Sequence, residues 1–228
     1  MSEKVTREQV VAAFGGYRDA FEQCVVGSVP MLPRAVTNVE GFYWWALVGF
    51  TQPDMILESG VCHGRSTLIL AKAQRFYRVR DMWAFECSTN CEGEARERLK
   101  DYRGCCYWTI DSKVGFAQVA ELNPGKRILA IIDGPKGPAI RPLLDTLVGH
   151  NVVGIGCHDL HGPTRGLAFT AAVEQRFPGM FAFRTDPQLN SGLRGLNDSI
   201  ADDLHMVEHE EHDPPGNERW NYVGIAVR

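Results

Sequence analysis

The sequence predicts an α/β fold in which a mostly parallel sheet lies between two layers of helices, a doubly wound arrangement. Three observations support this prediction. From residue 54 onward, short apolar runs alternate with helical stretches, which is the rhythm of βαβ units. Some runs, such as Ile128–Ile132, are continuously apolar, as in strands buried on both faces. A glycine-rich turn follows the first run, and acidic residues follow later ones, where open α/β sheets bind ligands.

The predicted elements follow one another along the chain with short connections. The expected strands are Met55–Glu58, Asp81–Glu86, Tyr107–Ile110, Ile128–Asp133 and Val152–Cys157. The helices expected between them are Ser66–Phe76, Glu92–Tyr102, Val114–Leu122 and Ala139–Leu147. Parallel neighbours need such helical crossovers. After residue 160 the sequence predicts a helix at Phe169–Phe177 and strands at Met180–Arg184 and Tyr222–Val227.

Two segments flank or interrupt this rhythm. Residues 1–50 are predicted to be a helical extension or lid on a domain spanning 51–228, with one helix over Val5–Phe21. The aromatic-rich Gly41–Phe50 has two interpretations, a helix packed on the sheet or a lid over a hydrophobic ligand. Residues 186–220 form a long polar insertion. Its residues His205, His209 and His212 would share one side of a helix, as part of a solvated acidic segment or of a metal cluster.

The composition of the chain limits the kinds of partner that we expect it to bind. The net charge of −4 argues against a nucleic-acid partner, which usually meets a strongly basic face. The sequence has no apolar run long enough for a spanning helix, and its first residues are polar, so we expect no membrane association. Seven cysteines without C-x-x-C spacing indicate reduced thiols in a cytoplasmic protein. Cys87 and Cys91 could form half of a zinc site, but no second half is visible in the sequence.

The turn after the first strand has the form Glu58-Ser59-Gly60-Val61-Cys62-His63-Gly64-Arg65-Ser66-Thr67. Its two glycines allow a tight turn and a close approach of the backbone to a ligand. The helix that follows would direct free N–H groups at the same place, with Ser66 or Thr67 as a cap. The spacing differs from the G-x-G-x-x-G of dinucleotide folds, which disfavours a nicotinamide dehydrogenase.

Polar residues recur at the tips of the next strands. Glu86, at the end of the second strand, can accept hydrogen bonds from both hydroxyls of a ribose. Asp111 and Ser112 follow the third strand, and Asp133 ends the fourth. Because the carboxyl ends of parallel strands meet at one edge of the sheet, we expect these residues to lie together there.

On these motifs the sequence resembles the class I S-adenosylmethionine-dependent methyltransferases, closest to the small-molecule O-methyltransferases. The resemblance covers roughly residues 54–228 and implies a Rossmann-like, seven-stranded sheet that ends in an antiparallel hairpin. It also implies that S-adenosylmethionine is the cofactor. No N/D-P-P-Y segment follows the fourth strand, which argues against amino methylation of DNA or protein. The implied cofactor-binding residues are Glu58, Ser59, Gly60, Gly64, Ser66, Thr67, Glu86, Cys87, Asp111, Ser112 and Asp133.

The catalytic residues are expected near the tips of the fourth and fifth strands. A hydroxyl acceptor loses its proton to a general base or a metal ion. The candidates are His158, Asp133, Asp159 and His161. His158 or His161 would act as base, or Asp133 and Asp159 with His158 would hold Mg²⁺ or another divalent cation, or the His-Asp pair is structural.

The predicted function is O-methylation of a small-molecule acceptor. The alternatives are a non-catalytic S-adenosylmethionine-binding or scaffold protein, and a metal-dependent enzyme with other chemistry on the same fold. The sequence leaves open whether the chain forms a homodimer.

Overall fold

The computed structural model describes residues 6–30, 32, 35–135, 137–158, 160, 162–185 and 223–228. Asp159, His161 and the predicted insertion at 186–220, with its three histidines, lie outside the described residues. The predictions made for them therefore stay predictions.

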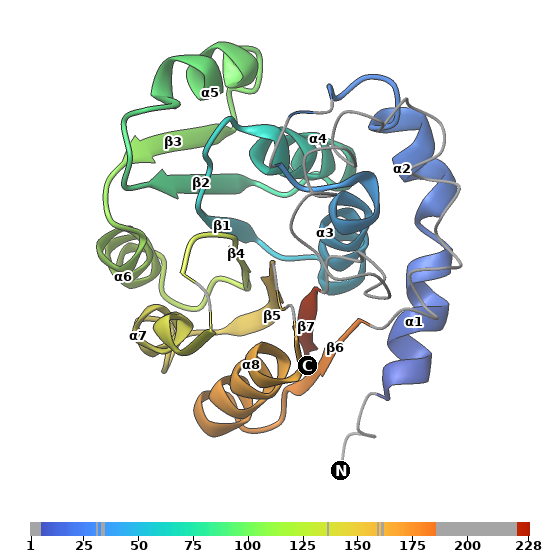
Figure 1. The fold of residues 1–228 in the computed structure, drawn as a ribbon, viewed down its shortest axis with the longest axis vertical. Coiled ribbons are helices and arrows are strands. Elements are labelled where there is room, and N and C mark those ends of the chain that lie inside the picture. Colours follow the sequence, from blue (N-terminus) through green and yellow to red (C-terminus); the bar gives the residue numbers. More distant parts are fainter. Residues whose placement is uncertain are drawn as a thin grey trace.

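A seven-stranded sheet forms the centre of the molecule (Figure 1). Its strands are β1 (Met55–Ser59), β2 (Asp81–Glu86), β3 (Cys105–Thr109), β4 (Ile128–Ile132), β5 (Val152–Cys157), β6 (Phe181–Arg184) and β7 (Gly224–Val227). Their order is β3-β2-β1-β4-β5-β7-β6. The first five strands pair in parallel, whereas β7 pairs antiparallel with both β5 and β6. The predicted fold class, including the antiparallel C-terminal pair, is confirmed.

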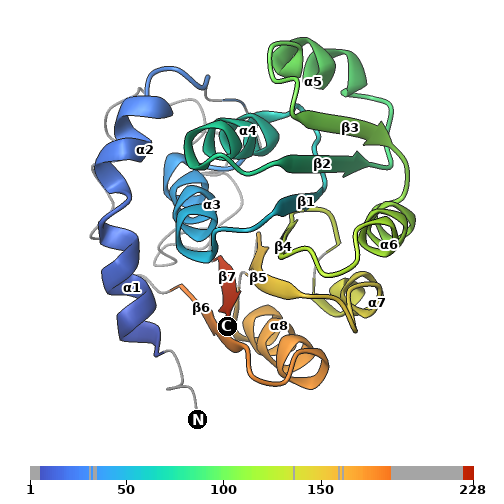
Figure 2. The same cartoon turned by 180° about the vertical axis from the view of Figure 1, so that it is seen from behind.

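Helices cover both faces of the sheet (Figures 1 and 2). They are α1 (Arg7–Gly15), α2 (Arg18–Cys24), α3 (Asn38–Thr51), α4 (Arg65–Tyr77), α5 (Glu92–Leu99), α6 (Ser112–Leu122), α7 (Ile140–Asp145) and α8 (Gly162–Arg176), with a 3-10 turn at Gly137–Ala139. One hydrophobic cluster joins helices α1 to α5 to one face, and a second joins α6, α7 and α8 to the other. The result is the three-layer arrangement that the alternating pattern predicted.

Helix α3 is part of the core. Every residue of α3 except Phe50 is buried, and the helix contacts β4 and β5. The interpretation of Gly41–Phe50 as a helix packed on the sheet is therefore confirmed. The division of the chain at residue 50 stays a prediction, although α3 lies in the same hydrophobic cluster as β1 and α4. None of the helices in the described ranges is both long and apolar enough to cross a membrane.

Some predicted boundaries were wrong, for local reasons. The single helix expected over Val5–Phe21 is broken into α1 and α2 at Gly16 and Tyr17, directly after Gly15, because glycine is a poor helix former. Strand β3 ends at Thr109, one residue before the predicted end, because the chain turns there into the cap of α6. Helix α8 begins at Gly162, well before the predicted start at Phe169.

Candidate functional site

The turn between β1 and α4 needs both of its glycines. Gly60 has a φ of +88°, and a Cβ there would lie 2.6 Å from the backbone nitrogen of Gly134. Gly64 has a φ of +85°, and its Cβ would lie 3.2 Å from the Cα of Ala95. The carbonyl of Ser59 accepts hydrogen bonds from the backbone N–H groups of Asp133 and Gly134 at 2.7 and 3.0 Å. The tips of β1 and β4 are therefore in direct contact.

The first turn of α4 faces the site without a capping side chain. Gly64 is the N-cap and brings no side-chain acceptor. The prediction that Ser66 or Thr67 caps the helix was therefore wrong, because both residues lie inside its first turn. An uncapped helix start offers backbone N–H groups to an anion.

The side chain of Glu86 bends back onto the glycine-rich turn. Its Oε2 accepts hydrogen bonds from the backbone N–H groups of Val61 and Cys62 at 3.0 and 2.9 Å. Its Oε1 accepts one from Ser88 at 3.0 Å. A carboxylate oxygen can accept two hydrogen bonds, and the second position on Oε1 is taken only by the weak thiol donor of Cys87 at 3.6 Å, which a stronger donor can replace. The carboxylate thus fixes the turn and still has capacity for a ligand hydroxyl.

The third strand tip joins the same edge. The Ser59 hydroxyl donates to the Ser112 hydroxyl at 2.8 Å, which links the ends of β1 and β3. Asp111 is the N-cap of α6, and its Oδ1 accepts the N–H of Lys113 at 2.8 Å. Cys87 is exposed beside Glu86. The structure therefore places the predicted residues of the first three tips next to one another.

Glu58, the last but one residue of β1, is completely buried. Burial raises the pKa of Glu58 to about 8, a shift that hydrogen bonding by the hydroxyls of Ser66 and Thr67 partly opposes. The nearby charges of Asp133 and Glu86 add to the increase in pKa. Glu58 is therefore largely protonated at neutral pH in the ligand-free protein.

This protonation predicts a pH-dependent stability. Between pH 4.5 and about 8, Glu58 is protonated in the folded protein but ionised in the unfolded chain. Unfolding therefore releases a proton, and the free energy of unfolding decreases as pH rises through this range. Glu58→Gln imitates the protonated side chain, so its free energy of unfolding should increasingly exceed that of the wild type over this range. The upper limit is ~1.4 kcal/mol per pH unit. Urea unfolding at several pH values measures the difference, and a pH-independent difference would contradict the prediction.

At the tips of β4 and β5, His158 lies between two carboxylates. Its Nδ1 is 2.7 Å from Oδ1 of Asp133, and its Nε2 is 2.7 Å from Oε1 of Glu40. Glu40, at the start of α3, also accepts the backbone N–H of Thr37 through Oε2 at 2.7 Å. His158 and Glu40 are buried, whereas Asp133 is partly exposed. We call this group the Glu40–His158–Asp133 bridge.

The charges of the bridge determine the state of the imidazole. Burial alone would lower the pKa of His158, but the charges of Glu40 and Asp133 and their hydrogen bonds raise it well above its ordinary value. The imidazole is therefore protonated at neutral pH, with both nitrogens engaged. The roles predicted for His158 as a general base, and for Asp133, Asp159 and His158 as ligands of a divalent cation, stay predictions.

The sequence interpretation missed Glu40. A signal was present, since Thr37-Asn38-Val39-Glu40 has the form of a capping box and Glu40 is the only acidic residue of an otherwise apolar helix. A capping role would by itself explain an acidic residue at this position. Its second contact, with His158, depends on how α3 packs against the end of β5.

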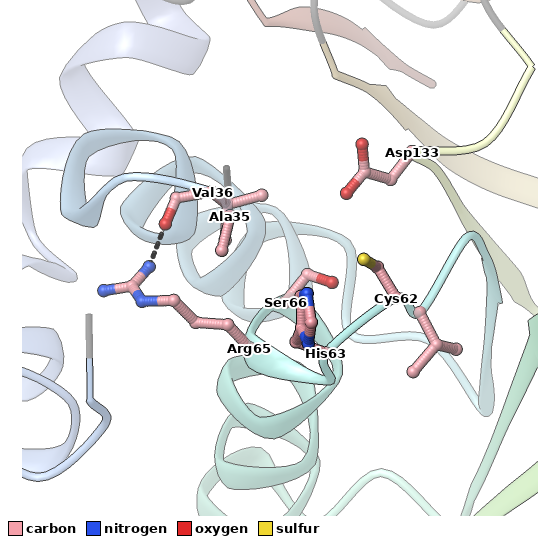
Figure 3. Close-up of a pocket in the computed structure, with 8 residues that line it drawn as sticks. Ala35, Val36, Cys62, His63, Arg65, Ser66 and Asp133 are labelled. Carbon is pink, nitrogen blue, oxygen red and sulfur yellow. Dashed lines mark hydrogen bonds between the residues drawn. The ribbon is translucent and has the colours of Figure 1, made fainter. Parts of the chain in front are cut away.

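A small pocket opens beside the glycine-rich turn (Figure 3). It is lined by Ala35, Val36, Val61, Cys62, His63, Arg65, Ser66 and Asp133. The guanidinium of Arg65, which is buried, donates to the carbonyls of Pro30 and Val36 and to Oδ1 of Asn38. Arg65 thereby ties the start of α4 to the segment that precedes α3 and closes one side of the pocket (Figure 3).

Solved structures share this architecture. A putative O-methyltransferase from Klebsiella pneumoniae superposes with a TM-score of 0.55 at 16% identity, over 98% of this chain and 91% of that one. Cofactor-bound Rv0187 from MTB gives 0.53 at 16% identity, over 96% and 88%. The O-methyltransferase from Bacillus cereus in complex with SAH gives 0.51 at 13% identity, over 95% and 91%. The chain has the class I methyltransferase fold.

No protein-family profile matches the sequence, and no curated protein matches it significantly. The similarity to these methyltransferases is thus one of fold, since it covers nearly the whole chain at 13–16% sequence identity. Within this methyltransferase fold, the turn residues, Glu86, Ser112 and Asp133 all lie at the carboxyl edge of the parallel strands. The roles assigned to these residues stay predictions.

Proposed function

We propose that this protein is an S-adenosylmethionine-dependent methyltransferase that methylates a hydroxyl group of a small molecule. The observation that carries the proposal is the meeting of four strand tips at one edge of the sheet. The glycine-rich turn, Glu86, Ser112 and Asp133 come from β1, β2, the start of α6 and β4, and they surround the same edge. The fold shared with the O-methyltransferases supports the same function.

The residues at this edge fit the proposed cofactor by their chemistry. The second acceptor position on Oε1 of Glu86 suits a ribose hydroxyl. The uncapped start of α4, at Arg65 and Ser66, suits the carboxylate of the methionine part. Asp133, in the pocket wall, would face the positively charged end of the cofactor. The predicted contributions of Cys87 and Asp111 are part of the proposal.

S-adenosylmethionine, when bound, supplies an electrophilic methyl group on a sulfonium that leaves as a thioether. The protein mainly has to hold the acceptor oxygen in line with the bond that breaks. Asp133 lines the pocket and can accept a hydrogen bond from the acceptor hydroxyl. His158, bonded to the same carboxylate, would orient Asp133. The acceptor proton would go to Asp133 or to Asp159 or His161, the remaining candidates.

The charge of the chain, the pocket and the free cysteines bear on the chemical class of the acceptor and on the cellular location of the protein. A chain with a net charge of −4 and a carboxylate, Asp133, in the pocket wall suits a small organic hydroxyl better than a polyphosphate backbone. The seven free cysteines suit a reducing compartment, so we propose a cytoplasmic location.

Removing the Glu86 side chain is expected to weaken S-adenosylmethionine binding. Glu86→Ala loses the charge-assisted acceptor for the ribose and also the anchor of the turn. Hydrogen bonds to charged groups contribute ~1.5–3 kcal/mol, so the Kd should rise about 10- to 100-fold. Calorimetric titration with S-adenosylmethionine measures the change. Glu97→Ala, an exposed glutamate on α5, is the matched control and should bind as the wild type.

The proposed reaction is tested by mass spectrometry of S-adenosylhomocysteine formed with a panel of catechols, phenols and hydroxy acids. We expect turnover with at least one acceptor and loss of turnover in Asp133→Asn. Tight cofactor binding without turnover on any acceptor would favour the non-catalytic alternative. Absence of cofactor binding by the wild type would overturn the proposal.

A further inference from the structure

Three side chains that can bind a metal ion meet beside the glycine-rich turn, and two of them, Cys62 and His63, also line the pocket there. Cys62 and His63 belong to the turn between β1 and α4, and Cys91 is the N-cap of α5. The Sγ atoms of Cys62 and Cys91 are 3.9 Å apart, and Sγ of Cys91 is 3.7 Å from Nε2 of His63. All three ligand atoms lie within 4.8 Å of one another. No other such group occurs among the described residues.

The two separations from Cys91 match those of zinc ligands. Bond lengths of about 2.3 Å to sulfur and about 2.0–2.1 Å to nitrogen, at the tetrahedral angle, place two sulfurs about 3.8 Å apart and a sulfur and a nitrogen about 3.6 Å apart. The observed distances between Cys91 and its two partners differ from these by about 0.1 Å. A Cys₂His set leaves the fourth tetrahedral position for water or another ligand. The distance between the sulfurs is far too long for a disulfide.

The imidazole is held in the orientation that a ligand needs. Nδ1 of His63 lies 3.1 Å from Oε2 of Glu94, so Nε2 is left to face the two sulfurs. A carboxylate on the far nitrogen is the usual support of a metal-bound histidine. Arg98 fixes the same unit, since its guanidinium donates to Oε2 of Glu94 and to the carbonyl of His63.

The backbone also holds Cys62 in an unusual position. Its φ is +46°, in the left-handed region that glycine favours. Strained residues of this kind cluster at functional sites. The N–H of Cys62 donates to Glu86, so the geometry of this cysteine is coupled to the carboxylate at the tip of β2. Cys62 is exposed, and His63 and Cys91 are partly exposed, which leaves a path for an ion.

We propose that Cys62, His63 and Cys91 form a binding site for a zinc-like divalent cation, with Glu94 as the residue that positions His63. The two thiols lose their protons on binding, so that Zn²⁺ with two thiolates and a neutral imidazole carries no net charge. The site links the cofactor turn to the start of α5 and stabilises both. The proposal does not depend on the proposed methyl transfer, because metal binding is measured without cofactor or acceptor.

Cobalt is the probe of choice, because Co²⁺ bound to thiolates gives a charge-transfer absorption that a purely histidine site lacks. The reduced full-length protein, freed of metal, should bind one Co²⁺ per chain with this band, and Zn²⁺ should displace it. Cys62→Ser and Cys91→Ser should abolish the band and weaken zinc binding at least about 100-fold in competition with a chromophoric chelator. Glu94→Gln should weaken zinc binding about 10- to 100-fold. Cys87→Ser, an exposed cysteine nearby, should bind as the wild type.

A second measurement needs no variant. Zinc should slow alkylation of Cys62 and Cys91 in the wild type, as read by peptide mass spectrometry, while Cys87 reacts at an unchanged rate. The absence of a thiolate band in the wild type, its persistence in Cys62→Ser or Cys91→Ser, or its loss in Cys87→Ser would each overturn the assignment. Co²⁺ binding without a thiolate band would place the ion elsewhere and also overturn it.

Discussion

His158→Ala is expected to be strongly destabilising, because it removes the positive charge from the Glu40–His158–Asp133 bridge. The substitution leaves the buried Glu40 carboxylate without its cation and facing Asp133 across a cavity. Loss of one partner of a buried ion pair typically costs ~3–5 kcal/mol. For a chain of this size that corresponds to a decrease in Tm of roughly 6–20 °C. Urea unfolding at neutral pH measures the free energy.

The stability loss caused by His158→Ala should also depend on pH. Because the folded pKa of His158 is raised, its contribution to stability is complete below the ordinary histidine pKa and is lost only as pH rises through the raised value. The deficit of His158→Ala should therefore be complete below the ordinary histidine pKa of 6.5 and shrink as pH rises above it. The metal-free His63→Ala variant is a matched control, since its pair with Glu94 is solvent-exposed and should contribute ~1 kcal/mol at most. Equal stability losses in the two variants would contradict the bridge.

Gly60→Ala is expected to disrupt the turn that the cofactor proposal depends on. A φ of +88° strains any residue with a Cβ, at ~1–3 kcal/mol. The new methyl would also lie 2.6 Å from the nitrogen of Gly134 and 3.0 Å from the carbonyl carbon of Asp133, so the tips of β1 and β4 must separate. Such overpacking costs a further ~1–3 kcal/mol. Unfolding experiments should show the sum, and S-adenosylmethionine binding should weaken with it.

Gly125→Ala separates the two effects. Gly125 has a similar φ of +78°, but a Cβ there meets no atom within 4 Å. This control should show the strain alone and leave cofactor affinity unchanged. If Gly60→Ala were no more destabilising than Gly125→Ala, the close contact between β1 and β4 would not be supported.

Local patterns in the sequence were sufficient for the fold and for half of the candidate site. Continuous apolar strands such as Ile128–Ile132 and the helices between them predict parallel pairing, which the structure confirms. The glycine-rich turn and the acidic residues at the strand tips follow, because parallel strands all end at one edge. Errors arose where a local signal was weak, as in the break at Gly16 and Tyr17.

The partners of the buried polar groups could not be predicted from such patterns. His158 was expected to act as a base, as a metal ligand or as part of a structural His-Asp pair, and none of these interpretations included Glu40, which α3 brings to its second nitrogen. Cys91 was paired in the sequence interpretation with Cys87, whereas the structure places it beside Cys62 and His63. Glu86 was expected to bind a ribose, and in the structure it also accepts hydrogen bonds from two backbone N–H groups of the glycine-rich turn.

The sequence by itself thus determined the order of elements, the parallel sheet and the edge at which a ligand would bind. These properties depend on periodicity and on residues that are neighbours in the chain. The tertiary structure alone decided the charge state of His158 and the grouping of the two cysteines with His63. Those properties depend on contacts between distant segments. The packing of α3 brings Glu40 to His158, and the packing of α5 brings Cys91 to Cys62 and His63.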